Sequence, residues 1–143
     1  MSVKRIRKLI LSLIKLSLKI SKKMKFIIHN LNNTSAIELL TDEKCFQSEQ
    51  DALDLMANVD YQFNSRKIIV HKENVDENFF NLRTGLAGGI LQKFTNYKVR
   101  LAIVGDFTNY SSKSFRDFMY ESNKNKLIMF LPDLDTALKE FES

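Results

Sequence analysis

Two polar stretches that follow apolar runs hold the residues best suited to chemistry. His71 closes one run and is followed by Asn74, while Asp106 lies at the end of the next long run and is followed by Tyr110. An imidazole beside a carboxylate is typical of an oriented general base, and it is also half of a metal site. Caps and turns use the same residue types, which is the plainer interpretation. Either role depends on the elements that position these residues.

The hydrophobic pattern predicts a single α/β domain. Apolar runs and alternation favour strands at 25–29, 36–40, 66–71, 99–107 and 126–131. Helical spacing and capping residues favour helices at 48–63, 75–94, 111–124 and 133–142. The first two strands form a hairpin, and the later alternation of helix and strand indicates a largely parallel sheet. The predicted fold is a five-stranded, mostly parallel sheet opened by a β-hairpin, with four helices in the order β-β-α-β-α-β-α-β-α.

The position of the candidate residues follows from this order. In an open parallel sheet, ligands bind outside the carboxyl ends of the strands. His71, Asn74, Asp106 and Tyr110 would then face one crevice at that edge of the sheet. His29 lies in the hairpin, too far back to be counted as a sure partner of His71.

The second predicted helix begins at Asp76 as N-cap and is marked by an apolar stripe from Phe79 to Phe94. Its interior contains the stretch GLAGG, whose glycines each cost about 1 kcal/mol relative to alanine in a helix. Such glycines indicate close packing or a ligand near the backbone. This reading places Thr84 inside the helix.

The sequence contains no motif for a catalytic nucleophile, a phosphate-binding loop or a cysteine-based site. No nucleophile motif is present, and GLAGG lacks the spacing of a phosphate-binding loop. The single cysteine, Cys45, excludes a disulfide within the chain and an all-cysteine metal site. We therefore expect no cofactor and no metal ion, and a reducing cytoplasm as the setting.

The charge of the chain is divided unevenly. Residues 1–23 hold eight of the 22 basic residues and no acid, which leaves 14 basic and 17 acidic residues, a net charge of −3, in residues 24–143. The high pI of about 9.3 therefore comes from the N-terminal segment. A mildly acidic domain does not favour nucleic acid as a partner.

Residues 1–23, the basic N-terminal segment, allow two main interpretations. Aliphatic residues gather on one side of a helical wheel and lysines on the other, which is typical of a helix that lies on an anionic membrane surface. Alternatively, translation begins at Met24, where the composition changes, and the domain is residues 24–143. The segment is too interrupted to span a membrane, and it lacks the cleavage site of a signal peptide.

Four stretches of the sequence resemble an uncharacterised bacterial family, the domain of unknown function 4180. They are DALDLMANVDYQF, KIIVHKENV, FFNLRTGLAGGILQKFTNYKVRLAIVGDFTNYSSKSFRDFMYESNK and ALKEF. The resemblance runs from Met24 to about Glu142, is specific across 51–124, and implies no assigned activity.

More distantly, the order of elements and the stretch RLAIVGD look like the STAS and SpoIIAA-like fold. That group includes anti-sigma-factor antagonists, in which a Ser or Thr just before a Gly is phosphorylated by a partner kinase. The stretch RTGLAG places Thr84 before Gly85, so the resemblance implies Thr84 as a phosphoacceptor candidate.

The sequence thus predicts a non-enzymatic binding or regulatory module. We expect it to dock a protein partner or a small ligand at the strand-end crevice, with His71, Asn74, Asp106 and Tyr110 as candidates for that face. One alternative is a peripheral membrane protein, recruited to the inner face of the membrane by residues 1–23. The other is an enzyme that uses His71 and Asp106.

Overall fold

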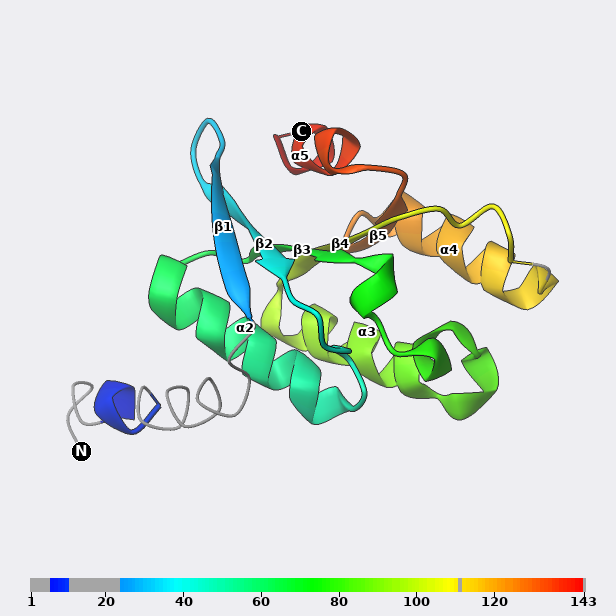
Figure 1. Cartoon of the computed structure of the whole chain (residues 1–143), viewed down its shortest axis with the longest axis horizontal. Coiled ribbons are helices and arrows are strands. Elements are labelled where there is room, and N and C mark those ends of the chain that lie inside the picture. The colour runs from blue at the N-terminus through cyan, green and yellow to red at the C-terminus, as the bar shows by residue number, and fades with distance from the viewer. Residues whose placement is uncertain (1–5, 11–23, 111, 143) are drawn as a thin grey trace.

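The computed structural model describes residues 6–10, 24–110 and 112–142. The fold is mixed α/β, with a five-stranded sheet whose strands lie in the order β1-β2-β3-β4-β5 (Figure 1). Residues 6–10 are helical, and most of the basic N-terminal segment lies outside the described residues. Among the described helices, none is long and apolar enough to cross a bilayer.

The sheet opens with the predicted hairpin. Strands β1 (Lys25–Asn30) and β2 (Ser35–Leu40) pair antiparallel through six consecutive residue pairs. The turn between them is closed by the amide of Leu31, which donates to the carbonyl of Thr34 at 2.8 Å. No residue of this turn has a positive φ, so Asn32 and Asn33 do not use the left-handed conformation that they tolerate.

The other three strands run parallel to β2. They are β3 (Lys67–His71), β4 (Arg100–Val104) and β5 (Ile128–Leu131). The helices that connect and follow them are α2 (Glu49–Phe63), α3 (Leu86–Tyr97), α4 (Lys113–Asn125) and α5 (Leu134–Glu142). The prediction of a largely parallel sheet opened by a hairpin is therefore confirmed.

Two hydrophobic clusters lie on opposite faces of the sheet, because successive residues of a strand point to opposite sides. Ile68 and Val70 of β3 join the larger cluster, to which α2, α3 and α4 contribute. Ile69, between them, joins a smaller cluster with Ala137 and Phe141 of α5. Figure 1 shows α2 and α3 below the sheet and α5 above it.

Helix α2 begins where its capping residues predict. The hydroxyl of Ser48 accepts from the amide of Asp51 at 3.2 Å, and the Asp51 carboxylate accepts from the amide of Gln47 at 2.9 Å. The first bond satisfies an amide that the first turn of a helix leaves free, and the second fixes the residue just before the N-cap.

The predicted continuous helix from Asp76 is wrong. Three short 3₁₀ helices come first, at Lys72–Asn74, Glu77–Phe80 and Leu82–Thr84, and α3 starts only at Leu86. The Asp76 carboxylate accepts from the amide of Asn78, two residues on, and so turns the chain locally instead of starting an α-helix. Gly85 then has φ +75°, a left-handed conformation that no right-handed helix can contain.

Candidate functional site

The carboxyl ends of β3 and β4 lie side by side, as expected. His71 is in register with Val104, the last residue of β4. Lys72 follows the first strand and Gly105 the second. A Cβ at position 105 would lie 2.6 Å from the Cβ of Lys72, so only glycine lets the two segments approach this closely.

Lys72 makes several contacts at this edge. Its ammonium lies 4.8 Å from the centre of the Tyr110 ring and 5.5 Å from that of Phe107. It also donates a hydrogen bond to the carbonyl of Asp106. A cation over an aromatic face contributes about 0.5–1 kcal/mol at exposed sites. The side chain therefore ties the end of β3 to the loop after β4.

Tyr110 belongs to an aromatic cluster at the same edge. Its ring stacks on Phe80 with a centroid distance of 5.4 Å and lies 5.2 Å from Phe115. Burial of the ring, and next the nearby carboxylate of Glu77, raise the pKa of the Tyr110 hydroxyl. The phenol is neutral at physiological pH, and its ring packs against the rings of Phe80 and Phe115.

Asp106 presents a charged side chain beside this cluster. The hydroxyl of Thr108 donates to its carboxylate at 2.5 Å, and the Thr108 amide donates at 2.9 Å. These hydrogen bonds lower the pKa of the Asp106 carboxyl, which is exposed and ionised at neutral pH. Asp106 therefore combines a turn-forming role with an accessible negative charge.

Asn74 lies at the same edge but is buried, and both its side chain and its backbone carbonyl are hydrogen-bonded. Its side-chain amide donates to the carbonyl of Thr41 at 2.7 Å, and its own carbonyl accepts from the amide of Cys45 at 2.5 Å. The residue fastens the loop after β2 to the end of β3. Its side chain is therefore buried and bound to the loop after β2.

His71 takes part in a different group of residues. Its Nε2 lies 2.6 Å from one carboxylate oxygen of Glu38, and the Nε2 of His29 lies 2.9 Å from the other. These residues, the His29–Glu38–His71 cluster, link β1, β2 and β3. Within the part of the chain that the structure describes, His71 and Asp106 share no hydrogen bond, and each has its own partner.

Glu38 is the residue that sequence reasoning missed. It lies within the apolar run of β2, and it is only 5% exposed. A carboxylate within such a run was the available signal, because a buried charge needs partners. Burial raises the pKa of Glu38, but the hydrogen bonds from His29 and His71 outweigh burial and hold the pKa below its usual value.

The histidines and Glu38 have the residue types of a zinc site, but their arrangement is that of hydrogen-bonded partners. Each imidazole binds a different oxygen of one carboxylate. Among residues 6–10, 24–110 and 112–142, no group of three His, Cys, Asp or Glu side chains is placed to hold a metal ion.

Thr84 lies outside the helix in which the apolar stripe placed it. It ends the Leu82–Thr84 turn, is exposed, and comes just before Gly85, the N-cap of α3. Its hydroxyl donates to the carbonyls of Asn78 at 2.7 Å and Asn81 at 2.9 Å. The side chain is accessible and locally hydrogen-bonded.

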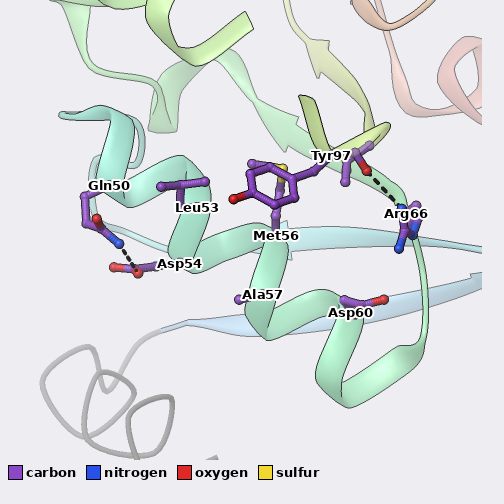
Figure 2. A pocket seen from close by; sticks show the side chains of 9 residues that line it. Gln50, Leu53, Asp54, Met56, Ala57, Asp60, Arg66 and Tyr97 are labelled. Atoms are coloured by element: carbon purple, nitrogen blue, oxygen red, sulfur yellow. Dashed lines mark hydrogen bonds between the residues drawn. The ribbon is translucent and has the colours of Figure 1, made fainter. Parts of the chain in front are cut away.

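A cavity of about 390 Å³ lies at the opposite, amino-terminal edge of β3 and β4. We call it the α2 groove; it is lined by Gln50, Leu53, Asp54, Met56, Ala57, Asp60, Arg66, Tyr97 and Val99. Figure 2 shows the Tyr97 ring beside Met56, with Asp54 and Asp60 at different places along α2. The prediction of a ligand site did not include this edge.

Comparison with known proteins gives one match. A family model described as a domain of unknown function (DUF4180) matches residues 17–141, which is all but the first 16 and the last two residues. The matched span starts before Met24 and so includes the end of the basic N-terminal segment. No curated protein and no solved structure matches this chain.

Proposed function

The chain belongs to the DUF4180 family, and from this premise we propose that it is a cytoplasmic, non-enzymatic binding module. It docks a protein partner or a small ligand at the carboxyl edge of β3 and β4. The residues that present this edge are Lys72, Asp106 and Tyr110.

The anchored lysine is the observation that supports this proposal. Lys72 is fixed by two aromatic rings and a backbone carbonyl, so the edge is ordered before any ligand arrives. Binding to an ordered surface avoids much of the entropy cost of fixing side chains. Beside it lie an exposed carboxylate and a half-buried tyrosine, and aromatic residues are enriched where proteins bind one another.

The test is the capture of a partner by variants of this edge. We expect Asp106→Ala and Tyr110→Ala to release a protein or small molecule that co-purifies with the wild-type chain. The chain offers close controls, because Asp133 accepts from Thr136 as Asp106 does from Thr108. Tyr120 likewise lies under a lysine, with the Lys124 ammonium 4.5 Å from its ring.

Retention of the bound species by both edge variants would contradict the proposal. So would its equal loss from Asp133→Ala and Tyr120→Ala, since these substitutions lie outside the edge. Circular dichroism of each variant separates loss of binding from loss of fold.

A second function, attachment to a membrane surface, is favoured by residues 6–10. This helical stretch exposes Ile6, Leu9 and Ile10 by 45%, 58% and 38%, beside the basic residues Arg7 and Lys8. Exposed aliphatic side chains on a basic helix suit an anionic bilayer surface. We expect the chain to sediment with anionic vesicles and Leu9→Glu with Ile10→Glu to abolish this; sedimentation unchanged by that pair would contradict it.

We extend the proposal to a STAS-like relationship and to Thr84 as its phosphoacceptor. The support is the exposed position of Thr84 immediately before the N-cap of α3. Phosphopeptide mapping of the chain from its native source tests this assignment. Recovery of the Thr84 peptide only in its unmodified form, under all growth conditions, would contradict it.

A further inference from the structure

The α2 groove has an apolar floor and a charged rim. Leu53, Met56, Ala57 and Val99 supply aliphatic surface, and the exposed ring of Tyr97 stands at one side. The Arg66 guanidinium donates to the carbonyl of Tyr97 at 2.9 Å, which fixes that side of the groove. A volume of about 390 Å³ is within the range of ligand sites.

The charged residues of the helix that forms the groove are all acidic. The sequence of α2 contains Glu49, Asp51, Asp54 and Asp60 and no lysine or arginine. Asp54 and Asp60 lie on the groove itself, and both are exposed. Arg66 also lines the groove, where its guanidinium donates to the carbonyl of Tyr97. Two carboxylates and one guanidinium leave a net negative lining, which is complementary to a basic ligand with apolar side chains that reach the floor.

The basic N-terminal segment of the same chain has this composition. It carries eight lysines and arginines and no acid. Its described residues 6–10 are helical, and Ile6, Leu9 and Ile10 are exposed at spacings of three and four residues. This is the spacing with which an amphipathic helix inserts anchors into a groove.

The point where the segment joins the domain lies beside α2. Phe26, two residues after Met24, contacts Phe63 at the end of α2 with ring centroids 5.6 Å apart. Helix α2 has 15 residues and is about 22 Å long at 1.5 Å per residue. The 13 residues between Ile10 and Met24 can extend over about 45 Å, so the anchors can reach any part of the groove.

We propose that the α2 groove binds the basic N-terminal segment of its own chain, with Ile6, Leu9 and Ile10 on the apolar floor and the basic residues beside Asp54 and Asp60. This interaction is intramolecular. It does not depend on the carboxyl edge of β3 and β4, and it competes with a membrane for the same aliphatic side chains.

A spin label at residue 8 of the full chain tests the proposal. Lys8→Cys places a thiol on the polar side of the segment, and the native Cys45 does not compete, because it is buried and burial raises its pKa to about 12. We expect the label to broaden the amide signals of Ala57 and Tyr97, to the same extent after dilution of the protein.

Charge reversal provides the matched comparison. Asp54→Lys with Asp60→Lys should abolish the broadening, whereas Asp117→Lys with Glu121→Lys, at exposed acids on α4, should preserve it. Groove amides that never broaden, or that broaden equally in both double variants, would overturn the proposal. Broadening that disappears on dilution would also overturn it, because the groove would then bind a second copy of the chain.

Discussion

Replacing Glu38 tests how the His29–Glu38–His71 cluster holds three strands together. Glu38→Gln keeps the shape of the side chain and removes its charge. The amide oxygen can accept from one imidazole, but the amide NH₂ then faces the other. That second histidine must carry its proton on Nδ1, or it loses its partner. The variant therefore weakens both interactions without leaving a cavity.

The size of the effect follows from the burial of Glu38. Hydrogen bonds to a charged group contribute about 1.5–3 kcal/mol each. The two histidine side chains are 20% and 27% exposed, so water can replace part of what they lose. We expect Glu38→Gln to lower the free energy of unfolding by about 2 kcal/mol at neutral pH. Glu38→Ala, which also leaves a cavity, should lower it by about 4 kcal/mol.

The dependence on pH has a definite sign. The pKa of Glu38 is lower in the folded chain than its ordinary value, so the unfolded chain binds this proton more tightly. The stabilisation is therefore present above the pKa of the unfolded carboxyl and is lost as pH falls through the lower, folded pKa. The difference between wild type and Glu38→Gln should be complete at neutral pH and shrink below about pH 4.

Urea unfolding followed by far-ultraviolet circular dichroism measures these differences, since the chain has no tryptophan. Glu121→Gln is the control, because Glu121 is 69% exposed and its ammonium partner lies at 3.9 Å. An exposed pair of this kind contributes at most about 1 kcal/mol. A Glu38→Gln protein as stable as wild type, or a difference that persists unchanged at acid pH, would refute the reasoning.

The complementary change removes both imidazoles. In the double variant His29→Ala with His71→Ala, burial still raises the pKa of Glu38, but the two hydrogen bonds that lower it are gone. We expect the pKa of Glu38 to rise above its ordinary value, as followed by carbon NMR of the carboxyl group during a pH titration. A pKa that stays low would show that other groups hold the charge.

Three further outcomes are expected. Gly105→Ala places a Cβ 2.6 Å from that of Lys72 and should cost about 1–3 kcal/mol in urea unfolding; wild-type stability would contradict this. Phe46→Ala, at a fully buried ring 6.0 Å from that of Phe94, should cost about 3–5 kcal/mol, and a cost below about 1 kcal/mol would argue against a tight core there. Cys45, whose pKa is raised to about 12 by burial, should react with a thiol reagent only after unfolding, so rapid reaction of the native protein would contradict its burial.

Much of the fold was predictable because local signals and packing agree. The apolar run of β3 is buried, and Ser48 caps α2 as its position before the helical stripe indicated. The alternation of helix and strand then leaves few ways to build the sheet. These periods predicted a largely parallel sheet opened by a hairpin, whereas the order β1-β2-β3-β4-β5 within the sheet comes from the structure.

The first part of the predicted helix at 75–94 was wrong, because a stripe of apolar residues does not report backbone conformation. The aromatic pair Phe79 and Phe80 is buried or half-buried, as the stripe implied, but in a 3₁₀ turn. The left-handed conformation of Gly85 separates that turn from α3. A glycine in the sequence permits such a break but does not require it.

The composition of the candidate site was only partly predictable. The adjacency of Lys72 and Asp106 follows from the parallel order of two strands. The pairing of His29 with Glu38 depends instead on the register of the hairpin, in which Ile27 lies opposite Glu38 and His29 lies opposite Ala36. A shift of one residue would turn the histidine to the other face, and the alternation of residues alone does not fix that register.

The order of the strands in the sheet has a consequence for synthesis. Each strand from β2 to β5 pairs with the strand that precedes it in the chain. A chain that leaves the ribosome from its N-terminus can therefore add each new strand to an edge that has already emerged. Every pairing closes a loop that contains at most one α-helix, which keeps the sequence separation between paired strands short for a parallel sheet. The growing sheet exposes one new edge at a time, and the next segment to be synthesised covers it.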